Sequence, residues 1–561
     1  MHLLDSFRSR VTCIPTVHEV CAGIAAEYFN QVSRDEKAFA LVTAGPGATN
    51  ITTALAGAWL EHRELLVIGG QVKSTDLRSK GIRQRGIQEV DGISLCRPIC
   101  KETLQIASPR PRQEVEEAIR SGRSGRQGPV FIEFCLDAQG ALVTQDLTDW
   151  HTKESFKESL ETSTIHQIHE ATRLLNAASR PAILIGAGVN REYGQSSGPQ
   201  LDELDIPLLT TWHGADRISS TLKNYIGRID TWGQRAANLV VNQADVVLAI
   251  GARLGLQETG FNWREFAKNA KVIHVDIDQT ELDKGHPETH LKICGDATLV
   301  LDQVLGQLVK KPSEWVDYCN AIKANLPLND SSNTTSAGYV SPYEFYERIS
   351  QVAEEQDIWV PASSGGANSV AIQALQIRSG QSCVCDNGLA SMGYGLPGAI
   401  GAAFGSQGRR VVLIEGDGGF AQNLQELATV SVNNLNIKMF LFCNDGYGSI
   451  RTTQRNYFGG SYLGCDTSTG LGFPVWEQLA LAYGVEHVAL TNLERDFDTL
   501  STRLQENGPL LVEVRIDPEQ TYWPKITSFL RSDGTMESNP LYKMTPELDK
   551  TLAELTMRYI K

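Results

Sequence analysis

The hydrophobic pattern of this chain is clearest in two stretches, residues 410–420 and 440–446, each of which begins with a short apolar run, 411–414 in the first and 440–443 in the second. Each run has the continuous β-branched and apolar composition of a strand that is buried on both faces, and each ends abruptly in small and polar residues. Between them, residues 422–432 place Leu424 and Leu427 on one face of a helix. We therefore predict a strand, a helix and a second, parallel strand, and ligands of such sheets bind beyond the carboxyl ends of the strands.

The same alternation of apolar strands and helices extends over most of the chain and predicts the α/β class. We expect three doubly wound parallel-sheet domains, at residues 1–140, 166–310 and 341–525. The polar stretches around them predict two linkers, 141–165 and 312–337, and a C-terminal tail, 526–561. The elements expected besides those above are strands at 38–43, 65–69, 130–134, 182–185, 246–250 and 272–275, and helices at 20–28, at 48–60 and from 545 onward.

Residues that suit a metal-bound phosphate follow both apolar runs. Asp417 follows the first run and Asn444 the second, so both fall at one edge of the predicted sheet. Mg²⁺ prefers oxygen ligands, with one or two protein carboxylates and phosphate oxygens. Gly416, Gly418 and Gly419 allow a phosphate to approach the backbone at the start of the next helix. The pattern indicates a Mg²⁺–diphosphate site, and the alternative is a glycine turn followed by an unrelated polar turn.

The spacing of these residues favours the Mg²⁺–diphosphate site over two unrelated turns. Asn444 lies 28 residues after Gly416, and a Gly-Asp-Gly step followed at this distance by Asn resembles the diphosphate-binding signature of thiamine diphosphate enzymes. The resemblance implies that Asp417, Asn444 and the backbone carbonyl of Gly446 hold Mg²⁺, and that the cofactor is thiamine diphosphate.

Segments of the first domain resemble the acetolactate synthase and pyruvate oxidase family. They are His18-Glu19, residues 44–50, Gly69-Gly70-Gln71-Val72 and residues 87–91. The resemblance implies that Glu19 shares a proton with the aminopyrimidine of the cofactor from a dry pocket, where burial raises the pKa of a carboxyl. It also implies that Pro46 and Asn50 lie near the cofactor and that Gln71 and Gln88 line the substrate side. The alternative for Glu19 is an acidic residue that favours a helix N-terminus.

Segments of the third domain extend the resemblance. Residues 387–399 are similar to the family's segment ahead of the metal site, which implies that Met392 wedges between the rings of the cofactor; the alternative is a core methionine. Ser364 and Gly365 follow an expected strand and would approach the diphosphate. Tyr447, Gly448 and Ser449 would line the way to the substrate, and Ser449 stands where acetolactate synthases generally have Met.

Four short segments punctuate the middle domain, at residues 185–188, 231–233, 251–253 and 274–278. Taken together, they resemble the domain that holds FAD in many members of the family. The resemblance implies that Arg253 faces the phosphates or ribose of FAD and that Asp276 or Asp278 faces its adenosine side. The alternative is a domain that has kept the fold and lost the flavin.

The resemblance implies a thiamine diphosphate-dependent carboligase that decarboxylates a 2-oxo acid, most readily pyruvate, and joins it to an acceptor carbonyl. One alternative is acetyl transfer from pyruvate to a keto-deoxysugar nucleotide, which residues 83–89, 260–264 and 524–541 favour by their likeness to such proteins. Others are a 2-oxo acid oxidase, decarboxylase or hydrolase with the same cofactor, and a non-catalytic paralogue. Glu19, Asp417 and Asn444 together count against the last.

Composition limits the partners. The net charge is −15 and no run of 18 apolar residues occurs, so we expect neither nucleic acid nor a membrane as a partner. Scattered cysteines without a Cys-x-x-Cys pair favour a cytoplasmic enzyme with free thiols. The resemblance implies a homodimer or homotetramer with active sites at the subunit interface. It also implies a strand and a glycine loop ahead of Met1, so either the natural chain starts upstream or the first domain lacks both.

Overall fold

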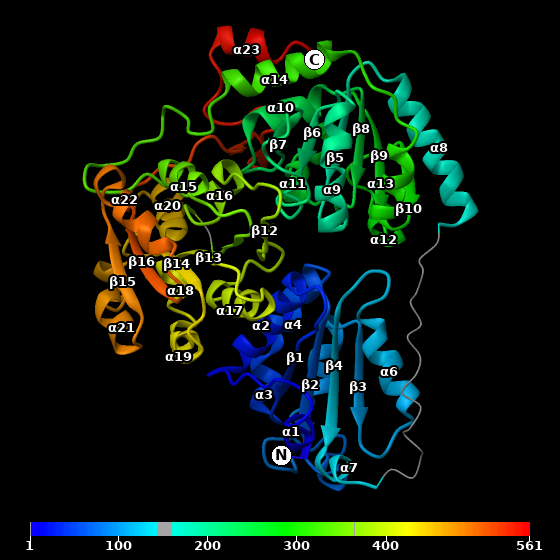
Figure 1. Ribbon diagram of the computed structural model, residues 1–561, viewed down its shortest axis with the longest axis vertical. Helices are drawn as coiled ribbons and strands as arrows, with labels where there is room; N and C mark the ends of the chain where they lie inside the picture. Colours follow the sequence, from blue (N-terminus) through cyan, green and yellow to red (C-terminus); the bar gives the residue numbers. More distant parts are fainter. Residues whose placement is uncertain (1, 143–159, 364, 561) are drawn as a thin grey trace.

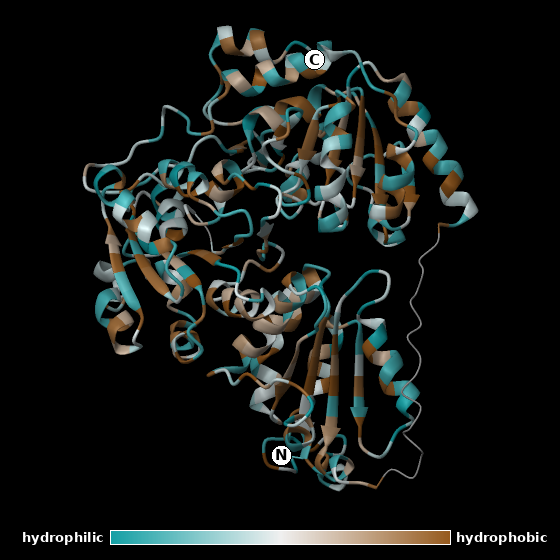
Figure 2. Ribbon diagram, in the orientation of Figure 1, coloured by the Kyte–Doolittle hydropathy of each residue, from teal (hydrophilic) through white to brown (hydrophobic). Residues whose placement is uncertain are grey.

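The chain forms three α/β domains, each built on a parallel sheet, in a computed structural model that describes residues 2–142, 160–363 and 365–560 (Figure 1). The predicted fold class is confirmed. Apolar residues concentrate on the central strands and polar residues on the outward faces of the helices (Figure 2). No helix of the described part is long and apolar enough to cross a membrane.

The first domain has a four-stranded sheet in the order β1-β2-β4-β3. One expected helix is in fact two, α3 and α4, which divide at Ile51. Strand β3 was not predicted, because it lies at the edge of the sheet and carries Glu102 and Gln105 among its apolar residues. The elements used below are β1 Phe39–Val42, β2 Leu65–Gln71, β3 Glu102–Ile106, β4 Pro129–Cys135, α2 Glu19–Val32, α3 Pro46–Asn50, α4 Thr52–Leu60 and α6 Arg112–Ser121.

The middle domain has a six-stranded sheet in the order β10-β9-β8-β5-β6-β7. Strands β5 and β8 are buried along their whole length, and the strand order reverses between them. The strands are β5 Pro181–Ile185, β6 Leu208–Thr210, β7 Tyr225–Arg228, β8 Val246–Ile250, β9 Lys271–Asp276 and β10 Leu291–Cys294, and the main helices are α8 Thr162–Ala177, α9 Arg191–Glu203, α10 Arg235–Gln243 and α13 Ala297–Leu305.

The prediction of a linker over residues 312–337 was wrong for its first half. Helix α14, Ser313–Asn325, packs Trp315, Cys319 and Ile322 onto the middle domain, and the indole Nε1 of Trp315 donates to the carbonyl of Pro181 at 2.9 Å. These three residues recur at helical spacing inside a polar stretch, so the signal was present but short. Within the other predicted linker, 141–165, residues 143–159 lie outside the described residues and α8 begins at Thr162.

The third domain has a six-stranded sheet in the order β12-β11-β13-β14-β16-β15, so the strand order reverses between β11 and β13. The carboxyl ends of strands next to such a reversal are where open α/β sheets bind ligands. The strands are β11 Ile358–Pro361, β12 Ser382–Cys383, β13 Val411–Gly416, β14 Ile437–Cys443, β15 Glu486–Leu490 and β16 Leu510–Arg515, and the helices used below are α17 Gly395–Gly405 and α20 Gly448–Tyr457.

Two helix boundaries in this part differ from the prediction. The chain turns directly into α18, Asp417–Phe420, and the helix expected over 422–432 is reduced to a 3₁₀ turn and α19, Leu427–Val432. The last helix, α23, begins at Lys550 rather than residue 545, because the Asp549 side chain caps it by accepting from the amide of Leu552 at 2.9 Å. Ahead of α23, the tail forms a hairpin of β17 Ser528–Leu530 and β18 Met536–Ser538.

The first and third domains dock through α2 and α17, which lie side by side in Figure 1. A Cβ on Gly401 of α17 would lie 2.0 Å from the carbonyl oxygen of Ala25. A Cβ on Gly398 would lie 2.7 Å from the Tyr28 ring, and one on Gly405 would lie 3.0 Å from the carbonyl oxygen of Phe29. Glycine on this face therefore lets the two helices approach closely and fixes the position of one domain on the other.

Candidate active site

Asp417 lies directly after β13 and is buried, with 3% of its surface exposed. Its Oδ1 accepts from the amide of Gly418 at 2.8 Å, and its Oδ2 accepts from the amide of Asn444 at 3.1 Å. Burial raises the pKa of Asp417 to about 7, although these backbone amides act to lower it. The structure therefore brings Asp417 and Asn444 together at the end of the sheet, as expected, and holds a carboxyl there that a cation would stabilise in its ionised form.

Asn444 supplies a second oxygen. Its Oδ1 is buried and has no hydrogen-bond partner among the described residues. Buried carbonyl oxygens rarely stay unpaired, so an orphan of this kind needs an explanation such as an ion. Among the described residues, the backbone carbonyl of Gly446 accepts only from the amide of Gly448, at 3.1 Å, which leaves it a further lone pair. Two or three oxygens thus fit a hard cation such as Mg²⁺.

The glycines beside Asp417 are required by close neighbours. A Cβ on Gly418 would lie 2.4 Å from Cε1 of Tyr447 and 3.2 Å from Cε of Met392. A Cβ on Gly419 would lie 1.9 Å from Oγ of Ser363. The structure therefore gathers the end of β11, the segment before α17, the end of β13 and the start of α20 around one turn. This arrangement suits a diphosphate that approaches the backbone.

Three further predicted residues have separate outcomes. Ser364 lies outside the described residues. Gly365 has a φ of +63°, and a Cβ at this position would lie 3.9 Å from the ring of Tyr522, near the end of the third domain. Ser449 is exposed in the first turn of α20, which begins at Gly448.

Two residues near this turn escaped the sequence analysis. Glu415 lies inside β13, is buried, and accepts from the hydroxyl of Ser363 at 3.3 Å; burial raises its pKa to about 7. A charged residue within an apolar run could have been noticed. Tyr522 could not, because nothing in the sequence connects the segment after β16 to the loop after β11.

Glu19 opens α2 in the first domain, and its Oε2 accepts from Nδ2 of Asn50 at 3.1 Å. The expectation of a raised pKa is not met in the single chain. Burial acts to raise the pKa of Glu19, but the side chain is only half-buried and the hydrogen bond from Asn50 lowers the pKa below its ordinary value. Glu19 and Asn50 therefore form a pair that the sequence analysis did not link.

The other predicted residues of the first domain lie in two places. Gln71 is buried in β2, and its Nε2 donates to Oε1 of Glu133 at 3.0 Å and to the carbonyl of Val90 at 2.9 Å. Gln88 is exposed with a φ of +62°, and its carbonyl oxygen lies 2.2 Å from the position of a Cβ on Gly45. The structure thus places Gln88 beside the turn before Pro46, whereas the side-chain amide of Gln71 forms hydrogen bonds within the first domain.

The two halves of the candidate site are carried by different domains. The described hydrogen bonds and ion pairs include none between the Glu19–Asn50 pair and the residues around Asp417. The nearest link is Glu426, whose carboxylate accepts from the amide of His18 at 2.9 Å and that of Val17 at 3.3 Å. Glu426 therefore fixes the start of α2 on the third domain.

In the middle domain, two glycine loops meet where the strand order reverses. A Cβ on Gly186, after β5, would lie 2.2 Å from the carbonyl oxygen of Gly251, after β8. Arg253 follows that loop and is exposed. Burial raises the pKa of Asp276, at the end of β9, to about 6, while Asp278 pairs with Arg126 of the first domain at 2.5 Å. Arg253 and Asp276 thus lie near the crevice where such sheets bind nucleotides.

Comparisons with known proteins agree with this architecture. The thiamine pyrophosphate enzyme models match the chain in three parts: the N-terminal TPP binding domain at residues 1–95, the central domain at 168–304 and the C-terminal TPP binding domain at 363–514. The probable acetolactate synthase large subunit of Methanocaldococcus jannaschii is 30% identical over 92% of this chain and 87% of its own length. The chain belongs to the thiamine pyrophosphate enzyme family.

Other relatives carry related names. The acetolactate synthase isozyme 1 large subunit of Escherichia coli strain K12 is 28% identical over 91% of this chain and 88% of its own. The acetolactate synthase large subunit of Lactococcus lactis is 30% identical over 88% of this chain and 84% of its own. This thiamine pyrophosphate enzyme is therefore acetolactate synthase-like along most of its length, and the Asp417 turn lies in the part that matches the C-terminal TPP binding domain.

The buried Asp417 carboxyl predicts a pH-dependent instability in the absence of ligands. Because its pKa is raised to about 7 in the folded chain and lies near 3.9 in an unfolded one, the stabilising effect of its protonated form is lost as pH rises through 7. We expect Asp417→Asn to melt at a higher temperature than the wild type at pH 8, and the difference to shrink towards pH 5. Thermal unfolding in EDTA measures this.

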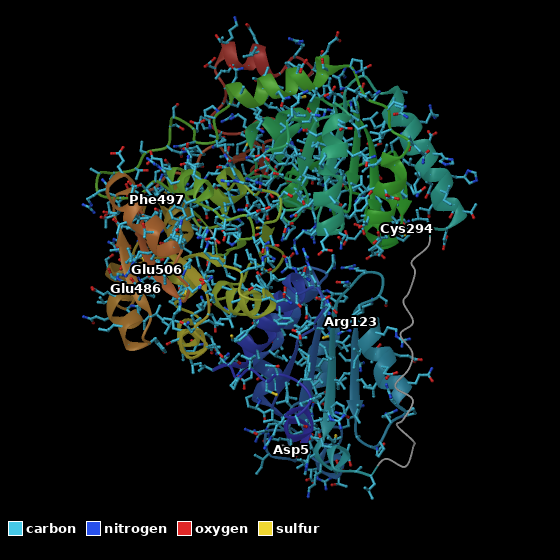
Figure 3. The ribbon with its side chains drawn as sticks, viewed as in Figure 1. Asp5, Arg123, Cys294, Glu486, Phe497 and Glu506 are labelled. Atoms are coloured by element: carbon cyan, nitrogen blue, oxygen red, sulfur yellow. The ribbon has the colours of Figure 1, made fainter. Side chains whose placement is uncertain are left out.

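The control is Asp5→Asn, at an exposed position on the end of the first domain that is farthest from the other two (Figure 3). This variant should follow the wild type at every pH. Equal melting temperatures for Asp417→Asn and wild type at pH 8 would contradict the raised pKa.

Proposed function

We propose that this protein is a thiamine diphosphate- and Mg²⁺-dependent carboligase that decarboxylates a 2-oxo acid, with pyruvate as the expected donor, and joins the remaining unit to an acceptor carbonyl. The observation that carries the proposal is the orphaned Oδ1 of Asn444 beside the buried carboxyl of Asp417. A Mg²⁺ ion with a diphosphate would satisfy both. Membership of the family and the acetolactate synthase names of the relatives support the reaction class.

Residues of the third domain would bind the metal ion, the phosphates and the rings of the cofactor. Asp417, Asn444 and the Gly446 carbonyl would hold Mg²⁺, and the backbone at Gly418 and Gly419 would admit the phosphates. Bound thiamine diphosphate supplies the electron sink that decarboxylation of a 2-oxo acid requires. Met392, which packs at Gly418, would support the rings of the cofactor.

Glu19 is the proposed proton carrier, and its bond to Asn50 orients the carboxylate. Activation requires that Glu19 exchange a proton with the aminopyrimidine, for which an isosteric amide has no capacity. Gln88, next to the turn before Pro46, and Gln71 are the proposed substrate-side residues of the same domain.

We expect Glu19→Gln to lower turnover of pyruvate by about 10²- to 10⁴-fold. Binding of Mg²⁺ and thiamine diphosphate should be within a few-fold of wild type, because the proposed metal ligands lie in another domain. Carbon dioxide release with product analysis measures the first, and titration calorimetry the second. Glu36→Gln, on the exposed turn after α2, is the control, and wild-type turnover in Glu19→Gln would remove Glu19 from the mechanism.

FAD in the middle domain is part of the proposal. The close glycine loops after β5 and β8, the exposed Arg253 and the half-buried Asp276 support a nucleotide there. We expect the purified protein, or the protein incubated with FAD and desalted, to show the visible absorption spectrum of a flavin. A colourless protein after that incubation would contradict FAD binding.

We further propose a homodimer or homotetramer with active sites between subunits. Glu19 is only half-buried in the single chain, and a second copy would supply the missing cover. Apolar side chains in and just after α20 support such a contact: Tyr457 is 64%, Phe458 65% and Leu463 78% exposed. Sedimentation equilibrium should give at least twice the chain mass of 61.5 kDa, and a monomer at micromolar concentration would contradict this.

A further inference from the structure

All three domains meet at the segment that carries Met392. This segment, the Met392 loop, comprises residues 385–393 between β12 and α17. Its C-terminal end is held from within the third domain, where Nδ2 of Asn423 donates to the carbonyl of Gly393 at 2.6 Å. Its N-terminal half is held by side chains of the other two domains.

Glu61, at the end of α4 in the first domain, makes the closest of these contacts. Its Oε1 accepts from the amide of Asn387 at 2.8 Å and from that of Gly388 at 2.6 Å. The side chain is 7% exposed. A carboxylate that accepts two backbone amides in a buried place is a short, strong and directional contact, so Glu61 fixes where the Met392 loop begins.

His213 of the middle domain faces the other oxygen of the same carboxylate, with 3.0 Å between its Nε2 and Oε2 of Glu61. Burial acts against a charged imidazole, but the Glu61 carboxylate outweighs it and raises the pKa of His213. The pairing in turn holds the pKa of Glu61 well below its ordinary value, against the effect of burial. The negative charge with which Glu61 accepts two amides is therefore balanced by His213 of the middle domain, together with Arg63 at 3.9 Å.

Arg63 provides a second contact between the first domain and the Met392 loop. Its Nη2 donates to the carbonyl of Cys385 at 2.7 Å, and its Nη1 pairs with Oε1 of Glu27 on α2 at 2.8 Å. The other oxygen of Glu27 accepts from the hydroxyl of Tyr394, two residues after Met392, at 2.6 Å. Residues on both sides of Met392 are thus tied to the first domain by buried, charge-assisted hydrogen bonds.

We propose that Glu61 is a positioning residue for thiamine diphosphate, which acts by fixing the Met392 loop at the Asp417 turn with His213 as its counter-charge. The inference rests on the proposed function, because Met392 matters only if the cofactor lies at that turn. Glu61 has no contact with Asp417, Gly418 or Asn444 among the described residues. Loss of the Glu61 carboxylate should therefore weaken binding of the cofactor rings, which Met392 would support, and leave the contacts to diphosphate and Mg²⁺ unaffected.

The test compares two ligands in calorimetry, Mg²⁺–thiamine diphosphate and Mg²⁺–pyrophosphate. Glu61→Gln keeps the size of the side chain but removes the charge that faces two amides and His213. We expect its affinity for thiamine diphosphate to fall about 10- to 100-fold, with pyrophosphate unchanged. A merely structural role would weaken both ligands alike.

The matched control is Glu64→Gln. Glu64 lies three residues further along, its side chain is 8% exposed, and it pairs with Lys37 and, at 2.9 Å, with Arg123 of the first domain, which is labelled in Figure 3. It has no described contact with the Met392 loop. This variant should bind both ligands as the wild type does.

A double-mutant cycle with Met392→Ala shows whether Glu61 acts through Met392. We expect Glu61→Gln to add little to the loss already caused by Met392→Ala, because residues that act through one another are not additive. If Glu61→Gln does not fold, His213→Gln supplies the same comparison, since it keeps a polar side chain beside Glu61 and removes the nearer of the two positive charges, leaving Arg63 at 3.9 Å.

The outcomes separate the two proposals. Failure of the wild type to bind thiamine diphosphate would overturn the proposed function itself. If the wild type binds thiamine diphosphate, three results would overturn the positioning role and leave the proposed function standing. They are wild-type affinity of Glu61→Gln for thiamine diphosphate, equal losses of affinity for thiamine diphosphate and pyrophosphate in that variant, and full additivity of its loss with that of Met392→Ala.

Discussion

The arrangement of the third domain depends on one constraint: the oxygens of Asp417 and Asn444 are buried together at the end of its sheet. The Asp417 carboxyl is buried among backbone amides that do not fully compensate its charge, and Oδ1 of Asn444 is buried without a partner. Both features oppose folding of the bare chain. A cation and its anion at the turn would compensate both, in line with the proposed function.

The architecture around that turn follows from close backbone approach. Gly401 and its neighbours let α17 contact α2, and Gly418 and Gly419 leave room for Tyr447, Met392 and Ser363. A side chain at any of these glycines would move an element that carries a site residue. The ionic contacts of Glu61, Arg63 and His213 complete the arrangement, because they connect the Met392 loop to the other two domains.

The success of sequence-based prediction varied with the range of the interactions involved. The turn of Asp417 and Asn444 was predictable because parallel strands place the ends of neighbouring runs at one edge. Helix α14 was missed because three apolar residues in a polar stretch are a weak periodic signal. The lowered pKa of Glu19 in the single chain was not predictable, because the exposure of its side chain and the hydrogen bond from Asn50 depend on how two segments meet, which residue type alone does not specify.

Local sequence patterns are enough to specify the α/β class, the three parallel sheets and the residue types at the ends of their strands. These are local properties, since apolar runs, glycine turns and helical periods are written within a few residues of one another. The convergence of Glu61 and His213 on the Met392 loop, in contrast, becomes visible in the folded chain alone. Glu61 and Asn387 are 326 residues apart, and a contact at that separation arises from domain packing, in which burial makes each charge require a partner that the local sequence does not name.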